Sequence, residues 1–241
     1  MIPNVPAPLV VEQHLGWTRL LLSRPDSRNA LDRHLISSLR AAIVAADRDP
    51  TIHAIVLGGA GGAFCSGLDL DELRRDRHDV VELLDELRRL HVALLTTSTP
   101  LIGACEKFAI NAGVALALAC DLLIAGDSTF IQVGEISQGM GIPMNAAWLR
   151  IRTTEATAMR LALGGDRIPA REAHRLGLFA EVVDDDSVMD RAVQLAVRLA
   201  GFPAGGPALV KRSVMATRTI DPETWLPGPD EIAAGFMERV R

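Results

Sequence analysis

Residues 100–125, PLIGACEKFAINAGVALALACDLLIA, decide the fold of this chain. The pattern predicts an apolar strand, a turn containing Asn111, Ala112 and Gly113, an apolar alanine-rich helix and a second apolar strand. A helix leaves the N–H groups of its first turn without backbone partners inside the helix. At a turn that opens a helix, such N–H groups can therefore point at a ligand.

A second turn of the same kind lies upstream. Residues 52–57, IHAIVL, predict a buried strand that ends in the glycines of GGAGG at 58–62. AFCSGLDL at 63–70 then leads into a polar helical stretch, where Leu68 is the candidate N–H donor. Two N–H groups aimed at one point form an oxyanion hole. For a single glycine-rich turn, an ordinary connecting loop is the alternative, and the spacing matches neither a dinucleotide fingerprint nor a P-loop.

The remaining pattern predicts an α/β domain. Strands at 52–57, 100–105 and 121–125 alternate with amphipathic helices at 32–46 and 76–95, which is typical of a parallel sheet with crossover helices. After residue 145 the pattern becomes mainly helical. The chain has 241 residues, of which 49% are hydrophobic, and this is enough for one well-buried domain.

Several segments resemble the enoyl-CoA hydratase/isomerase (crotonase) family, and they follow one another in the family's order. They are SRP at 23–25 with NAL at 29–31, GGAGGAFCSGLDL at 58–70, PLIGAC at 100–105 with CDLLIA at 120–125, LGGDRIPAREA at 163–173 with LGL at 176–178, and ALVK at 208–211. The resemblance extends from about residue 9 to residue 211.

The resemblance implies a crotonase-type spiral core of repeated ββα units with a C-terminal helical region. We expect the core over residues 1–200 and the helical segment over residues 201–241, packed on the core or on a neighbouring subunit. We expect the connection between them at PAGGP, residues 203–207. The family also implies a homotrimer or a dimer of trimers.

The resemblance further implies a site for an acyl-CoA thioester, whose carbonyl oxygen gains negative charge as an enolate forms. It places the two oxyanion donors at the backbone N–H groups of Leu68 and Ala112. It implies no separate cofactor, because coenzyme A is part of the substrate. The positions that it implies for CoA or substrate binding are Arg24, Ser66, Gly67, Asp69, Leu70 and Lys211.

Some of these positions have simpler interpretations. Arg24 and Lys211 are equally suited to a solvated surface, which is the usual place for such side chains. Asp69 and Asp121 are suited to capping helix or strand ends beside the site.

The sequence departs from family hydratases at Ala115, where these enzymes carry one of two glutamates that activate water. The second glutamate position corresponds to Glu135, within the largely apolar run FIQVGEISQGM. A desolvated pocket there would raise the pKa of Glu135 and make it a useful base, whereas a surface glutamate is the alternative. We expect Ala115 and Glu135 to face each other across the acyl pocket.

A single acid/base favours the isomerisation of an enoyl-CoA, which moves one proton from C2 to C4, over efficient hydration. A hydratase-like activity in fatty acid metabolism is the nearest variant of this hypothesis. The alternative from another class is a crotonase-fold protein that binds acyl-CoA as a scaffold without turnover. The missing glutamate, together with Asn111 and Ala112 in place of the family's glycines, is its support.

Charge, hydropathy and residue spacing argue against nucleic-acid-binding, secreted, membrane and metal-binding proteins. A net charge of −5 without a dense Lys/Arg run argues against nucleic-acid binding. The N-terminal residues lack the features of a secretory signal, and charges interrupt the longest apolar runs, so we expect a cytoplasmic protein without a membrane partner. The three cysteines lack a CxxC spacing and the six histidines are scattered, which predicts buried thiols and no metal site.

Overall fold

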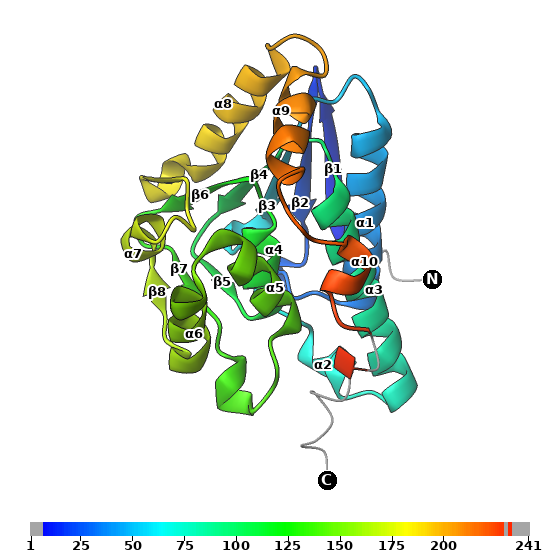
Figure 1. The fold of residues 1–241 in the computed structure, drawn as a ribbon, viewed down its shortest axis with the longest axis vertical. Coiled ribbons are helices and arrows are strands. Elements are labelled where there is room, and N and C mark those ends of the chain that lie inside the picture. Colours follow the sequence, from blue (N-terminus) through cyan, green and yellow to red (C-terminus); the bar gives the residue numbers. More distant parts are fainter. Residues whose placement is uncertain (1–6, 229–230, 233–241) are drawn as a thin grey trace.

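A computed structural model describes residues 7–228 and 231–232, and its centre is a six-stranded sheet in the order β1-β2-β3-β4-β6-β9 (Figure 1). The strands β2 to β9 in this order are parallel, and β1 pairs with β2 in the antiparallel sense. Their bounds are β1 (Leu9–His14), β2 (Trp17–Leu22), β3 (Ala54–Gly59), β4 (Leu101–Cys105), β6 (Leu122–Gly126) and β9 (Glu181–Val183).

Helices cover both faces of this sheet because its central strands are apolar on both sides. On one face, α8 (Val188–Ala200) packs against Val56, Ile102 and Ile124. The larger core lies on the other face and takes in α1 (Arg33–Arg48), α3 (Arg77–Thr96), α4 (Ala112–Leu118) and α5 (Pro143–Arg152). Each of these helices buries its apolar stripe, which is the amphipathic pattern that the sequence predicts for α1 and α3.

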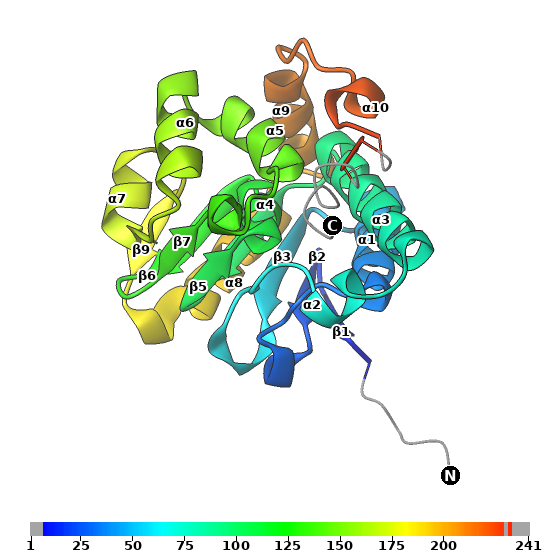
Figure 2. The same ribbon diagram turned by 90° about the horizontal axis from the view of Figure 1, so that it is seen from below.

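A second sheet of three short strands gives the fold its spiral form. It contains β5 (Phe108–Ile110), β7 (Phe130–Gln132) and β8 (Ile168–Pro169), and β5 and β7 lie side by side next to α4 (Figure 2). The chain passes from β4 through β5 into α4, and then from β6 through β7 towards α5. Cys65, which follows β3, forms an isolated bridge with Ala109 in β5 and so starts the same pattern one turn earlier. These turns are the expected ββα units.

Two of these turns lie in close contact. Gly67 has a φ of +102°, and a β-carbon there would lie 3.1 Å from the β-carbon of Asn111. A β-carbon on Gly113 would lie 2.5 Å from the carbonyl oxygen of Cys65. The turn after β3 and the turn before α4 can therefore meet because glycine occupies both contact points.

The C-terminal segment packs on the core of its own chain as far as it is described. After α6 (Glu155–Gly164) and α7 (Ala170–Arg175), α8 leads into α9 (Gly206–Met215) and α10 (Pro222–Trp225). Arg88 in α3 pairs with Glu223 in α10, which lies beside α3 (Figure 1). Leu226 and Ile232 join the larger core. Residues 1–6 of the predicted core and residues 229–230 and 233–241 of the predicted C-terminal segment lie outside the described residues.

We predict that Gly113→Ala lowers the free energy of unfolding, because the methyl group of the alanine would force the start of α4 away from Cys65. The expected cost is on the order of 1–3 kcal/mol in the free energy of unfolding, measured by chemical denaturation. Gly201→Ala is the matched control, since a β-carbon there would lie 3.4 Å from the carbonyl oxygen of Arg198, which is an ordinary van der Waals distance. Native stability in Gly113→Ala would contradict the close contact.

Candidate active site

One cavity brings together four of the predicted site residues. Leu68, Leu70, Ala112 and Glu135 all line it, and so do Leu, Ile and Met side chains from α2 (Leu70–Leu73), α3 and the segment before α5. Its volume is about 50 Å³. The cavity lies where the two turns meet, so the close contacts at Gly67 and Gly113 also position Leu68 and Ala112 in its lining. This cavity thus brings together the two predicted oxyanion donors and the predicted acid/base.

The N–H groups of Leu68 and Ala112 stand on the two turns that meet at this cavity. The turn after β3 forms an isolated bridge with Leu31 through the carbonyl of Gly67 and the N–H of Asp69, so the N–H of Leu68 between them takes no part in the bridge. Ala112 is the first residue of α4, whose first N–H groups have no partner within the helix. Among the described residues, neither N–H donates a hydrogen bond. The two predicted oxyanion donors therefore line one cavity with their N–H groups unused.

Asn111 holds the second turn in an uncommon conformation, with φ of 53° and ψ of −125°. A positive φ is unusual for a residue with a side chain. The amide compensates, because the Gly134 N–H donates to Asn111 Oδ1 at 2.9 Å and the Asn111 N–H donates to the carbonyl of Gln132 at 2.8 Å. An asparagine can therefore stand in this turn, where the resemblance implies glycine.

Glu135 opens the short 3-10 helix η3 (Glu135–Gln138) and is only 6% exposed. Asn145 Nδ2 donates to Glu135 Oε1 at 2.9 Å, while Glu135 Oε2 has no partner among the described residues. Burial raises the pKa of Glu135 to about 7, against the opposing hydrogen bonds from its own N–H and from Asn145. A carboxyl with this pKa can both accept and return a proton near neutral pH. Its catalytic role stays a prediction, but its environment suits that role.

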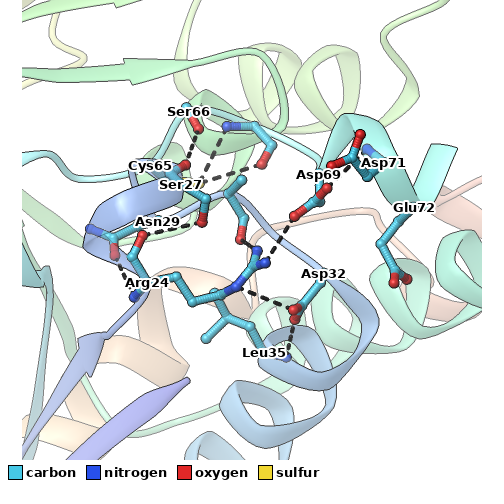
Figure 3. A network of polar contacts seen from close by, with 12 residues as sticks. Arg24, Ser27, Asn29, Asp32, Leu35, Cys65, Ser66, Asp69, Asp71 and Glu72 are labelled. Carbon is cyan, nitrogen blue, oxygen red and sulfur yellow. Dashed lines mark hydrogen bonds and ion pairs between the residues drawn. The ribbon is translucent and has the colours of Figure 1, made fainter. Parts of the chain in front are cut away.

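Arg24 and Asp69 form an ion pair within a network of polar contacts (Figure 3). The Arg24 guanidinium lies 2.9 Å from the Asp69 carboxylate and 3.2 Å from that of Asp32, the N-cap of α1. Burial opposes ionisation of Asp69, but hydrogen bonds from Arg24 and from the Asp71 N–H keep its pKa below the usual value. Asp69 also caps α2, as the sequence predicts. The pair fixes the segment after Leu68, and direct contact with CoA stays a prediction.

Ser66 and Lys211 lie outside the cavity lining. Ser66 Oγ donates to the carbonyl of Ser27 at 3.2 Å, next to the turn. Lys211 in α9 forms an ion pair of 2.7 Å with Asp121, donates to the carbonyl of Thr99, and has a side chain that is 9% exposed. Asp121 also accepts from the N–H at the start of β4, as a strand cap does. The structure therefore does not bring Lys211 to the other predicted site residues.

Ala115 is fully buried in α4 and does not line the cavity. It belongs to the larger hydrophobic core, together with Val114 and Leu116. That Ala115 and Glu135 face each other across the acyl pocket stays a prediction. Glu135 is the only acidic side chain that lines this cavity among the described residues.

Asn145 and Gln138 are the polar residues of the cavity lining that sequence reasoning missed, and Asn145 contacts the predicted acid/base. It lies in α5 and is 2% exposed, and its Nδ2 contacts both Glu135 and the carbonyl of Asn111. The signal in the sequence is one amide in an otherwise apolar first turn, PMNAA, ten positions after Glu135. An isolated asparagine in a helix carries no indication of its partner, so this contact depends on how α5 packs against α4.

The other sequence expectations concern cysteines, metals and membranes. Cys65, Cys105 and Cys120 are buried free thiols, and burial raises the pKa of Cys65 and Cys120 to about 12. Within residues 7–228 and 231–232, no three His, Cys, Asp or Glu side chains are grouped to hold a metal ion. No helix in the same residues is long and apolar enough to cross a membrane.

The spiral of ββα units, with a large parallel sheet and a small second sheet, is the crotonase fold. The family model described as enoyl-CoA hydratase/isomerase matches residues 14–225, and the chain belongs to this family. A solved structure of an enoyl-CoA hydratase from Mycobacterium avium subsp. paratuberculosis superimposes with a TM-score of 0.85 at 27% identity, covering 96% of this chain and 93% of that one.

Two curated relatives from Escherichia coli (strain K12) carry different activities. The chain is 32% identical over 217 residues to 1,2-epoxyphenylacetyl-CoA isomerase, covering 88% of this chain and 83% of the relative. It is 32% identical over 194 residues to 2,3-dehydroadipyl-CoA hydratase, covering 80% of this chain and 75% of the relative. Similarity at this level therefore supports an enzyme of the family without choosing between isomerisation and hydration.

We predict that Glu135→Gln stabilises the protein at high pH. The pKa of Glu135 rises from 4.5 to about 7 on folding, so the native state binds the proton more tightly and the free energy of unfolding falls as pH rises from 4.5 to 7. Glutamine avoids this loss, and we expect a gain of about 2–3 kcal/mol at pH 8.

Urea denaturation of both proteins from pH 4 to pH 8 measures the difference. It should shrink towards zero below pH 4.5, where both side chains are neutral in both states. A difference that does not change with pH would show that Glu135 is not desolvated.

Proposed function

We propose that the protein is an acyl-CoA enzyme that holds a thioester enolate between the N–H groups of Leu68 and Ala112 and moves protons with Glu135. The observation that carries this proposal is the shared cavity of two unused N–H donors and one buried carboxyl with a pKa of about 7. The cavity's other side chains are largely apolar, which suits an acyl group. Coenzyme A enters as part of the substrate, and the proposal requires no further cofactor.

Isomerisation of a 3-enoyl-CoA is the reaction that this residue set favours. Ionised Glu135 takes a proton from C2, and the electron pair of that C–H bond moves into the thioester, whose oxygen becomes the oxyanion. When the enolate collapses, the double bond shifts from C3–C4 to C2–C3 and Glu135 returns the proton at C4. One carboxyl does both transfers, and the only acid that lines the described cavity is Glu135.

We also propose a homotrimer or a dimer of trimers. The support in this chain is the outer face of α9, where Leu209, Val210 and Val214 are each at least 60% exposed. Three large apolar side chains grouped on one exposed helix face are typical of a surface that a partner covers.

We predict that Glu135→Gln lowers the turnover of a 3-enoyl-CoA about 10²- to 10⁴-fold, because it removes the general base. Formation of the conjugated 2-enoyl thioester, followed by ultraviolet absorbance, measures the rate. Glu106→Gln is the matched control, since burial also raises the pKa of Glu106 but this residue does not line the cavity. Tight acyl-CoA binding without turnover in the native protein would instead favour the scaffold hypothesis.

We predict a pH profile governed by the same carboxyl. The base works when ionised, so the rate for the 3-enoyl-CoA should rise about tenfold per pH unit below the pKa of about 7 and level off above it. Stopped-flow measurements from pH 5 to pH 9 test this expectation. A profile that is flat across pH 7 would mean that Glu135 is not the group that accepts the proton.

A further inference from the structure

We propose that Asn145 is a positioning residue that fixes the Glu135 carboxyl relative to the peptide group between Asn111 and Ala112. One side-chain amide then contacts both the predicted acid/base and the predicted oxyanion turn. The proposal rests on the function proposed above and adds the residue that fixes Glu135 and the oxyanion turn relative to each other.

The two hydrogen bonds from Asn145 define its orientation. Nδ2 donates to the backbone carbonyl of Asn111 at 3.0 Å and to Glu135 Oε1 at 2.9 Å. A backbone carbonyl can only accept, so the contact with Asn111 requires the nitrogen, and not the oxygen, at this position. Both hydrogens of the amide are therefore engaged, one on each half of the site.

The carbonyl that Asn145 contacts belongs to the same peptide group as the Ala112 N–H. In a planar trans peptide the C=O and N–H bonds point in opposite directions. Asn145 thus binds one end of this peptide while the other end carries the predicted oxyanion donor. Donation to the carbonyl also polarises the peptide, which strengthens its N–H as a donor. A change at Asn145 should therefore affect the oxyanion turn as well as Glu135.

A second contact closes this arrangement into a ring. Asn111 Oδ1 accepts from the N–H of Gly134, which directly precedes Glu135 in the chain. The links run from Asn111 to Gly134, along the backbone to Glu135, through its carboxyl to Asn145, and back to the Asn111 carbonyl. Such a ring restricts the distance between the acid/base and the oxyanion turn, and catalysis depends strongly on that distance.

The Asn145 side chain carries a cost to folding. Its Oδ1 is buried and has no partner among the described residues, and such an unsatisfied acceptor destabilises a fold. Glu135 Oε2 is also buried without a partner there. Since Asn145 occupies Oε1, Oε2 is the oxygen left to carry the proton.

The charge environment of Glu135 is simple, which makes its titration a clear readout. No other Asp, Glu, Lys, Arg or His lines the cavity from the described parts of α2, α3, α4, η3 or α5. The Asn145 hydrogen bond favours the ionised carboxyl and lowers its pKa. Loss of this bond should raise the pKa, since a hydrogen bond to a charged group contributes about one pKa unit or more.

The test compares native protein with Asn145→Ala, using a 3-enoyl-CoA for kinetics and ¹³C NMR of labelled glutamate, assigned with Glu135→Gln, for the pKa. We expect kcat to fall about 10- to 100-fold, KM to change less than about threefold, and the pKa of Glu135 to rise to about 8. Asn145→Asp, of the same shape, is the second variant if alanine prevents folding. It should raise that pKa further, because it places a second carboxyl beside Glu135.

Trp148→Phe is the matched control on the same helix. It removes another buried hydrogen bond, 2.9 Å from Trp148 Nε1 to His91 Nδ1, and among the described residues Trp148 forms no hydrogen bond with Glu135. It should lower the melting temperature and leave kcat and the pKa of Glu135 near their native values. A native kcat and pKa in Asn145→Ala, or the same changes in Trp148→Phe, would overturn the proposal.

Failure of the proposed function gives a different result. Native protein would then show no turnover that depends on Glu135, while the NMR titration in the Asn145 variants would still report whether the amide positions and tunes the carboxyl. An unchanged titration would overturn the positioning role even in that case.

Discussion

The close approach of two backbone turns is the constraint on which the rest of this structure depends. Gly67 and Gly113 let the turn after β3 and the turn before α4 come within contact distance, and the bridge between Cys65 and Ala109 aligns them. Because each turn ends in an N–H that the fold leaves unused, their contact places two donors on one cavity. Each of the two ββα repeats therefore contributes one backbone N–H donor to the cavity.

A buried carboxyl without a cation is the second element of the site. Several acids in this chain form ion pairs, as Asp32 and Asp69 do with Arg24, and such pairs hold loops in place. Glu135 instead meets an uncharged amide, so its pKa stays near 7. An arginine in place of Asn145 would favour the ionised form and remove the ability to return a proton. A neutral donor orients the carboxyl and still leaves it able to change charge.

Much of the fold could be predicted from the sequence, because its signals are local. The predicted strands at 52–57, 100–105 and 121–125 and the helices at 32–46 and 76–95 agree with β3, β4, β6, α1 and α3 to within two residues at each end. Hydrophobic periodicity and capping residues such as Asp32 and Asp76 determine these elements over a few turns of chain. The placement of Leu68, Ala112 and Glu135 on one cavity agrees with the resemblance to the crotonase family.

The parts that could not be predicted depend on which side chain meets which partner. Lys211 has the positive charge that would bind a phosphate, but in the structure this charge pairs with Asp121, just before β6, at 2.7 Å. Ala115 stands three residues after Ala112 and is fully buried in the larger core, and the helical pattern of α4 alone does not indicate which side chain it meets there. Asn145 illustrates the converse, since nothing in its neighbours along the chain indicates a site. It becomes informative only when α5 packs beside α4 and its amide meets a carboxylate and a carbonyl at once. The role of Asn145 is visible only from its two acceptors, the Asn111 carbonyl and the Glu135 carboxylate, which belong to separate turns of the spiral.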